Sequence, residues 1–586
     1  MSDRVSALWS AASIAVVGAS AKPGALGRLP IEFLQRYGYQ GRILPVNPRG
    51  GELLGLPVHR SVTEVPGPVE LALIMVSADR VEAAVEDCIA AGVEVAIIGS
   101  SGFAEAGPEG KARQDAIAAK ARTHGMRLLG PNCIGAASFH TGLIASFSPL
   151  FTGTSTELVP GGIGFVSQSG ALGYGTVSLA FERGLGLGWA VTTGNEADIT
   201  ALEALLALAA EPRCTGLLGY VESLTDADRL RALAATGKPV ALLKAGRTEA
   251  GARAAATHTG ALATEDRVVE ATLRQLGIVR VGDVDELLDV GDAFAAPYRP
   301  NGPRVAVVTT SGGSGILAAD AVADHGLVLA RLSQDTREAL RQIVPAYGSV
   351  GNPVDVTASV MNDPTLVERA LSVISADAGV DLLLVCFCVL TGDDVSAIVD
   401  ALATVGAESG KPVLVARTGA DHLAPDAARR LRAVGVPAYQ TPARAVRAAA
   451  ALWEVSRTHH RVRPVPGEPV PAPTTGTEAE LKRLLAAAGI AVPRLTVVTS
   501  PAEATAAVRD LGGRVVMKAL GLLHKTEAGG VVLGVDEWSA PDVYARLAAL
   551  GAPAPASGPA DSTGPAPAGY PTSGPAGGTG TGPAGT

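Results

Sequence analysis

The sequence lacks the marks of a membrane, secreted or nucleic-acid-binding protein. Its longest apolar run, Leu382–Leu390, has nine residues, whereas a membrane helix needs about 20. The five cysteines are odd in number and contain no Cys-x-x-Cys pair, which argues against a disulfide framework or a zinc site. No signal-peptide apolar segment follows the first residues. Lys and Arg number 48 against 57 Asp and Glu and form no basic run, so no nucleic-acid surface is expected. These features predict a cytoplasmic protein without membrane or nucleic-acid partners.

Aromatic and charged residues are also scarce, at 4% and 18%, while hydrophobic residues make up 47%. The chain is rich in Ala, Val, Leu and Gly, a composition typical of α/β folds. Short β-branched runs such as Ser13–Val17 and Arg304–Thr309 alternate with Ala/Leu/Glu helix patterns. This alternation predicts parallel sheets that are covered by helices on both faces. The 586 residues are enough for three to five domains.

Changes in composition divide this α/β chain into six segments. Phe147–Gly161 is rich in Ser, Thr, Pro and Gly, and Ala296–Pro303 holds three prolines. Arg461–Thr477 is Pro-rich and predicts a semi-rigid linker. Of the last 36 residues, 34 are Gly, Ala, Pro, Ser or Thr, so we expect a disordered tail. The predicted boundaries are 1–146, 147–298, 299–460, 461–477 (the linker), 478–550 and 551–586 (the tail).

In the first unit, a Gly-rich turn, Gly18–Gly27, lies between a predicted strand and a helix. Such a turn brings backbone N–H groups and a helix N-terminus to a phosphate. The glycine spacing is not G-x-G-x-x-G. The second strand leads to Arg49, where a nicotinamide site needs an acid. The arginine favours a ligand with an extra phosphate near the ribose, such as NADP or coenzyme A. A tight turn without any ligand remains the alternative.

The second and third units each contain a small polar turn ahead of a helix. Ser167–Gly170 and Gly312–Gly315 both follow predicted strands. Hydroxyls, backbone N–H groups and the positive end of a helix dipole are what an anion site requires. An ordinary N-cap is the simpler interpretation of the first turn. His258 lies in a loop of small residues and Glu222 ends a strand. Taken alone, each of these two fits a solvated side chain.

Four motifs of the first unit, in this order, resemble the CoA-binding domain of the ADP-forming acetyl-CoA synthetases, within the succinyl-CoA synthetase superfamily. They are Gly18-Ala19-Ser20, Pro45-Val46-Asn47-Pro48, Ser100-Ser101-Gly102-Phe103-Ala104-Glu105 and Gly130-Pro131-Asn132-Cys133. The resemblance implies a Rossmann-like CoA-binding domain. Its CoA channel would be lined by Gly18, Ala19, Ser20, Lys22, Arg49, Val76, Ser77, Ala78 and Asn132.

The next two units resemble the phosphohistidine part of the same family, which implies two flavodoxin-like, succinyl-CoA-synthetase-type domains. There a loop histidine attacks a bound acyl phosphate, so His258 would carry the phosphoryl group. A neutral imidazole nitrogen suits this role if the other nitrogen donates to a fixed acceptor, for which Glu222 is our candidate. By the resemblance, phosphate lies between two helix N-termini. Its predicted contacts are Ser167, Gln168, Ser169, Gly170, Gly312, Gly313, Ser314 and Gly315.

The last ordered segment, Glu478–Leu550, resembles the start of an ATP-grasp domain. The resemblance implies that Lys518 touches nucleotide phosphate and that His524 is a second phosphoryl carrier. It also implies ATP or ADP as substrate, with Mg²⁺ expected for the family. The place of the second ATP-grasp subdomain is taken by the Gly/Ala/Pro tail, so we predict no metal ligands and an incomplete nucleotide site.

The resemblance therefore predicts an NDP-forming acyl-CoA synthetase, an acid–thiol ligase of the ADP-forming acetate–CoA ligase type. It would interconvert acyl-CoA, phosphate and ADP with a small carboxylic acid, CoA and ATP. The incomplete ATP-grasp part would impair the half of the reaction that involves the nucleotide. We expect a homo-oligomer or a separate ATP-grasp partner subunit. The alternative is a non-catalytic CoA- or acyl-CoA-binding regulator, which the incomplete nucleotide half favours and the presence of His258 and Glu222 disfavours. An NADP oxidoreductase is disfavoured because no hydride-transfer site is evident.

Overall fold

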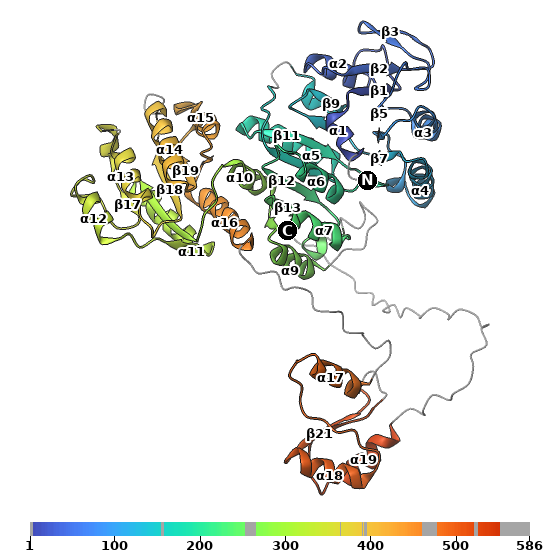
Figure 1. Ribbon diagram of the computed structural model, residues 1–586, viewed down its shortest axis with the longest axis vertical. Helices are drawn as coiled ribbons and strands as arrows, with labels where there is room; N and C mark the ends of the chain where they lie inside the picture. The colour runs from blue at the N-terminus through green and yellow to red at the C-terminus, as the bar shows by residue number, and fades with distance from the viewer. Residues whose placement is uncertain are drawn as a thin grey trace, which may run out of the picture. The chain divides into compact units, whose positions relative to one another are not determined.

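The computed structural model divides the chain into two units, Met1–Val462 and Arg463–Thr586 (Figure 1). It describes residues 4–153, 157–251, 253, 265–363, 365–389, 391, 395–459, 477–520 and 525–550. The predictions for His258, for His524, for the tail and for nearly all of the linker fall outside the described residues.

The first unit begins with a five-stranded parallel sheet in the order β2-β1-β5-β6-β7. Its strands are β1 (Ser13–Val17), β2 (Arg42–Val46), β5 (Leu71–Ile74), β6 (Val95–Ile98) and β7 (Arg127–Leu129). A hairpin of β3 (Gly51–Leu53) and β4 (Leu56–Val58) lies beyond β2. The helices are α1 (Ala7–Ser10), α2 (Leu29–Arg36), α3 (Val81–Ala90) and α4 (Pro108–Thr123). Every residue of β1, β5 and β6 is buried, because helices cover both faces of a parallel sheet.

The second sheet has seven strands in the order β14-β13-β12-β10-β11-β8-β9. They are β8 (Gly135–Ser138), β9 (Leu143–Ser146), β10 (Ile163–Ser167), β11 (Leu187–Thr192), β12 (Gly216–Val221), β13 (Val240–Lys244) and β14 (Val279–Val281). Its helices are α5 (Gly170–Arg183), α6 (Ala201–Ala209), α7 (Ala227–Ala235), α9 (Asp266–Leu276) and α10 (Val284–Ala295). The strands from β10 to β14 are parallel and have the flavodoxin order.

One predicted boundary needs correction. We placed residues 135–146 in the first domain, but β8 pairs antiparallel with β11 and β9 pairs with β8. This hairpin therefore belongs to the second sheet. Composition could not reveal this because β8 and β9 are short, fully buried strands like those of the first sheet, and pairing partners are decided by tertiary packing.

The third sheet repeats the flavodoxin order, β16-β15-β18-β19-β20, with β17 also paired to β15. Its strands are β15 (Arg304–Thr309), β16 (Val328–Leu329), β17 (Val354–Asp355), β18 (Leu382–Cys388), β19 (Val413–Thr418) and β20 (Ala438–Tyr439). Its helices are α11 (Gly312–Asp324), α12 (Gln334–Arg341), α13 (Thr365–Ser375), α14 (Val395–Ser409), α15 (Ala427–Ala433) and α16 (Pro442–His459).

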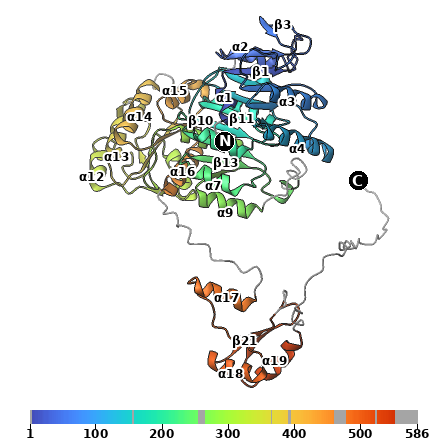
Figure 2. The same cartoon turned by 45° about the vertical axis from the view of Figure 1, so that its right-hand side comes forward.

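Helices join the second and third sheets. α10 and α16 contact each other and lie side by side in Figure 1. In Figure 2, α16 lies between the helices of the third sheet and β13. Buried residues of α5, α10, α11 and α16 belong to one hydrophobic cluster. Two ion pairs cross this region: Arg432 on α15 bonds Asp292 on α10 at 2.7 Å, and Arg444 on α16 bonds Asp289 at 2.7 Å. The two flavodoxin-like domains are therefore held by apolar packing and by nearly buried charge pairs.

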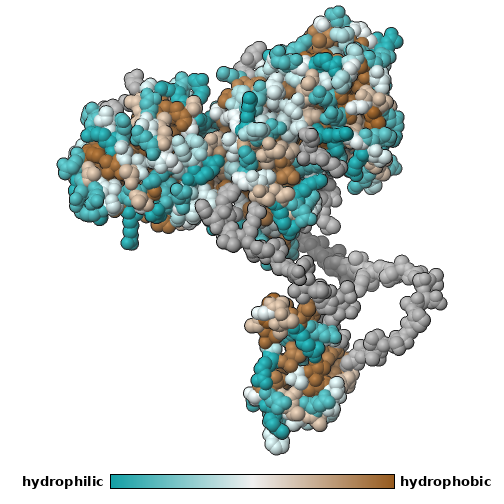
Figure 3. Space-filling model, in the orientation of Figure 1, coloured by the Kyte–Doolittle hydropathy of each residue, from teal (hydrophilic) through white to brown (hydrophobic). Residues whose placement is uncertain are grey.

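The second unit is small. It consists of α17 (Glu478–Ala487), α18 (Pro501–Leu511), β21 (Val515–Lys518), β22 (Val531–Val535) and α19 (Ala540–Ala549), with β21 and β22 antiparallel. Brown, hydrophobic atoms are visible on its surface in the space-filling view (Figure 3). Exposed apolar side chains of this unit include Val516, Leu533 and Trp538.

Candidate functional site

The predicted CoA residues gather at the carboxyl ends of the first sheet. The chain crosses from β2 to β5 on the other side of β1, so the crevice between β1 and β5 is the switch point where ligands bind. Gly18 follows β1 with φ of +92°, and a Cβ there would lie 2.5 Å from the Met75 carbonyl oxygen. Only glycine allows this approach of the two strand ends.

Both predicted cations of this site are exposed. Lys22 follows β1, Arg49 follows β2, and neither is in an ion pair with another described residue. The Asn47 side chain fixes this edge, because its Nδ2 donates to the Ala19 carbonyl at 2.8 Å and its Oδ1 accepts from Arg49 N at 3.0 Å. Val76, Ser77 and Ala78 follow β5. The geometry leaves two positive charges available to phosphate groups at one edge of the sheet.

Asn132 stands where the first sheet meets the second. It follows β7 with φ of +58°, and its Nδ2 donates to Asn195 Oδ1 at 3.3 Å. Asn195, which follows β11, in turn donates to Gln114 Oε1 of α4 at 3.1 Å. The loop after β11 therefore connects the predicted CoA site to the sheet that carries Glu222.

The turn before α5 has the form of an anion site. Ser169 is the N-cap residue, and its side chain makes no capping hydrogen bond. Ser167 is fully buried and donates from Oγ to the Ser169 carbonyl at 2.6 Å. Ser167 thus shapes the turn. The first N–H groups of the 14-residue helix α5 have no side-chain cap, so the positive end of the helix is free to bind an anion.

Gln168, predicted as a phosphate contact, is occupied by the protein itself. Its Nε2 donates to Glu196 Oε2 at 2.9 Å, and its Oε1 accepts from Ser223 N at 3.0 Å and from Glu222 N. Both ends of the amide are therefore engaged. In the described structure Gln168 ties the turn before α5 to the end of β12.

Glu222 lies at the end of β12, as the sequence predicts. Tyr220 donates from its hydroxyl to Glu222 Oε1 at 3.3 Å. Burial, together with the nearby Glu222 charge, raises the pKa of Tyr220 to about 12, so the phenol keeps its proton at neutral pH. Lys244 ends the neighbouring strand β13 and is 8% exposed. Burial lowers the pKa of this lysine.

The turn before α11 presents mainly backbone. Ser311 is its N-cap residue without a side-chain capping bond, and Gly312 and Gly313 are exposed. Ser314 and Gly315 are buried, so Ser314 faces the interior rather than the helix end. Of the four predicted residues, the two exposed glycines offer N–H groups to an anion. Their lack of side chains leaves the end of the helix accessible.

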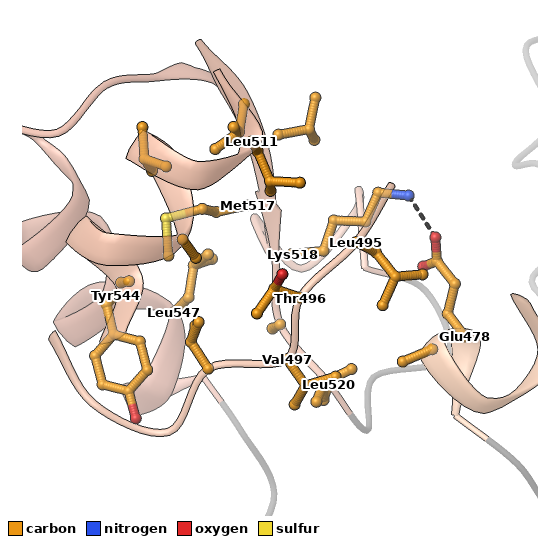
Figure 4. A pocket seen from close by; sticks show the side chains of 18 of the residues that line it. Glu478, Leu495, Thr496, Val497, Leu511, Met517, Lys518, Leu520, Tyr544 and Leu547 are labelled. Carbon is orange, nitrogen blue, oxygen red and sulfur yellow. Dashed lines mark hydrogen bonds and ion pairs between the residues drawn. The ribbon is translucent and has the colours of Figure 1, made fainter. Parts of the chain in front are cut away.

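In the second unit, Lys518 ends β21 and borders a pocket of about 650 Å³ (Figure 4). Its Nζ bonds Glu478 Oε1 of α17 at 2.7 Å, and Lys482 bonds the same oxygen at 2.9 Å. These two lysines lower the pKa of Glu478 to about 2. Leu495, Val497, Met517 and Leu520 belong to the apolar part of the lining. A lysine beside an apolar pocket is suited to a ligand with both a ring and a phosphate.

Within the described ranges, no group of three His, Cys, Asp or Glu residues could hold a metal ion. We assign Mg²⁺ no residue and no step. No helix among the described residues is both long and apolar enough to cross a membrane.

The sequence did not point to Glu196, Tyr220 and Lys244, which lie around Glu222 and the turn before α5. Tyr220 and Lys244 had one usable signal, since each lies at or next to the carboxyl end of a parallel strand. Glu196 had none, because it lies in a loop after β11 and its contact with Gln168 exists only in the folded chain.

Four family models match the chain. They are a CoA binding domain (residues 12–138), a succinyl-CoA ligase like flavodoxin domain (160–294), a ligase-CoA domain (305–463) and an ATP-grasp domain (473–558). The first three contain the parallel strands of the three large sheets, and the fourth contains the described residues of the second unit. The α/β fold with its CoA-binding, flavodoxin-like and ATP-grasp parts is thereby confirmed.

Relatives and a solved structure agree with these matches. The chain is 37% identical over 463 residues to the alpha subunit of acetate–CoA ligase [ADP-forming] I of Pyrococcus furiosus, covering 77% of this chain and 97% of the relative. It is 32% identical over 546 residues to acetate–CoA ligase [ADP-forming] I of Archaeoglobus fulgidus, covering 89% and 77%. The dinucleotide-forming acetyl-coenzyme A synthetase 1 of Ca. Korarchaeum cryptofilum, solved with phosphate and ADP, superimposes with a TM-score of 0.72 and 31% identity, covering 78% of this chain and 98% of that one.

The CoA-type crevice and the uncapped helix beside a strand-end acid agree with the relatives, which are more than 30% identical and of which the chain covers 77–97%. The chain belongs to the ADP-forming acetate–CoA ligases, the NDP-forming acyl-CoA synthetase family, and is an acid–thiol ligase.

Proposed function

We propose that this chain converts the acyl-CoA of a small carboxylic acid, with phosphate, to an acyl phosphate and CoA, and then passes the phosphoryl group through His258 to ADP. In the first step a phosphate oxygen attacks the thioester carbonyl, and the CoA thiolate leaves and takes a proton. In the second, a His258 nitrogen attacks phosphorus and the carboxylate leaves. In the third, an ADP oxygen takes the phosphoryl group, and the imidazole is regenerated.

The observation that supports this proposal best is the position of Glu222. It follows β12, and its backbone is bonded to the turn that opens α5. A helix N-terminus stabilises phosphoryl oxygens by fixed N–H dipoles, and such positioning supplies most of the catalysis in phosphoryl transfer. We assign to this carboxylate the role of accepting the proton of one imidazole nitrogen of His258. The other nitrogen is then left as the nucleophile.

The N-terminus of α11 is our second phosphate contact, through Gly312 and Gly313. On the nucleotide side, we assign ADP phosphate to Lys518, whose present partner Glu478 would have to be displaced. His524 remains a candidate second carrier. We propose a complete ATP-grasp subunit as the partner for this half, because one relative is named an alpha subunit.

The direct test is to incubate the purified chain with acetyl-CoA and radiolabelled phosphate. We expect free CoA to appear and the protein to acquire a label that is stable in alkali and lost in acid, as phosphohistidine is. CoA release can be followed with a thiol reagent in the same sample. If the chain binds CoA by calorimetry but shows no CoA release and no protein label, the non-catalytic CoA-binding regulator becomes the better interpretation.

The CoA site gives a separate prediction. Replacing Arg49 by alanine should weaken CoA binding by about 1.5–3 kcal/mol, since a charge-assisted contact to phosphate is lost. Isothermal calorimetry measures this directly. Arg122, exposed near the end of α4 and so close to the amino ends of the strands, provides a matched control, and Arg122→Ala should change the affinity little. Tight NADPH binding without a CoA signal would refute the assignment of this edge to CoA.

A further inference from the structure

One half-buried acid near the proposed site, Glu196, takes no part in the proposed reaction steps. Glu196 lies in the loop after β11, and its backbone has φ of +55°, a value uncommon for a residue other than glycine. Its Oε1 accepts from Ala201 N at 2.7 Å and from Thr193 Oγ1 at 2.8 Å. Its Oε2 accepts from Gln168 Nε2 at 2.9 Å. All three contacts are donors to the acid, which is the bonding pattern of a carboxylate.

This carboxylate decides which way the Gln168 amide points. An amide has one donor end and one acceptor end, and the donor end must face Glu196 because a carboxylate only accepts. The oxygen is then turned towards the end of β12, where it accepts from Ser223 N at 3.0 Å and from Glu222 N. If the amide were reversed, its NH₂ group would meet two backbone N–H groups.

The backbone of Glu222 is thus fixed on one side by Gln168, and its carboxylate accepts from the Tyr220 hydroxyl at 3.3 Å. We propose that Glu196 is a positioning residue which, through Gln168, holds Glu222 in place to orient the phosphoryl-carrying histidine. The proposal rests on the function proposed above. Backbone strain at Glu196 fits this role, because strained residues persist where the surrounding structure holds them.

The experiment uses three variants of the full chain and measures how fast acid-labile label appears after mixing with acetyl-CoA and radiolabelled phosphate. In Glu196→Gln, the introduced amide must use its oxygen for Ala201 N and Thr193, so its NH₂ faces the NH₂ of Gln168. In Gln168→Glu, two carboxylates face each other. We expect each single variant to label about 10- to 100-fold more slowly, the effect of losing one charge-assisted hydrogen bond.

The double variant Glu196→Gln with Gln168→Glu exchanges donor and acceptor. The amide at 196 then donates to the carboxylate at 168, whose other oxygen still accepts from the end of β12. We expect labelling to recover to within a few-fold of the original chain. Because Glu196 and Gln168 are in contact, recovery alone would also follow from a role in stability. The free energy of unfolding of each variant is therefore measured in urea, and a merely structural role would lower it without slowing the labelling of the folded protein.

Glu203→Gln is the matched control. Glu203 is a half-buried acid of α6 that bonds Arg127 at 2.8 Å and is not hydrogen-bonded to Gln168 or Glu222, and its loss should leave the labelling rate unchanged. Wild-type rates in either single variant, or a double variant no faster than the slower single variant, would overturn the proposal. Absence of label in the unsubstituted chain would instead refute the proposed function itself.

Discussion

Replacing His258 by asparagine should abolish the acid-labile label formed from acetyl-CoA and radiolabelled phosphate, the largest effect we expect from any single substitution. Asparagine is similar in size to part of the imidazole but has no nucleophilic nitrogen, so the phosphoryl group cannot be carried. Formation of acyl phosphate precedes this step and should continue, so CoA release persists while the label is lost. Measuring both products separates the two steps.

Glu222→Gln should retain the label but form it about 10- to 100-fold more slowly, because an amide orients imidazole less well and cannot stabilise positive charge on it. For His258→Asn the matched control is His124→Asn, since His124 is exposed at the end of α4 and its ring bonds the backbone of its own helix turn. Full labelling of His258→Asn, with loss of label in His524→Asn, would move the carrier to His524.

The second large effect concerns the contact between the two flavodoxin-like domains. Arg432→Met should destabilise the first unit by about 3–5 kcal/mol, because the Asp292 carboxylate would stay buried without its partner. The Asp292 side chain is only 4% exposed and receives hydrogen bonds of 2.7–2.9 Å from Arg432. Urea unfolding followed by tryptophan fluorescence reports on both domains, through Trp189 in β11 and Trp453 in α16.

Two comparisons test the cause. Arg429→Ala removes a neighbouring arginine of α15 whose pair with Asp426 is more than 60% exposed on both sides, and it should cost less than about 1 kcal/mol. Combining Arg432→Met with Asp292→Asn leaves no unpaired buried charge, so the double variant should be more stable than Arg432→Met alone. A double variant that loses the sum of both single effects would show that packing, and not charge, dominates this contact.

Local patterns determined a large part of this fold. β1 and β15 occur at the predicted residues Ser13–Val17 and Arg304–Thr309. The reason is that a strand buried on both faces must be a short continuous apolar run, and the chain can end such a run only with turn residues. The same logic placed Glu222 at a strand end and polar turns at the starts of α5 and α11. Motif order then identified the family, which the comparisons confirm.

Tertiary structure decided what those polar residues contact. The sequence predicts Gln168 as a phosphate contact. Its amide instead bonds Glu196 and the end of β12, because the turn before α5, the loop after β11 and the end of β12 meet there. Ser314 faces the interior and leaves the end of α11 to the two exposed glycines. Residues 135–146 joined the second sheet. Local sequence determines which residues form a strand, turn or helix, but hydrogen-bond partners distant in the chain are fixed only when the sheets pack, because most buried polar groups then pair with groups from other segments.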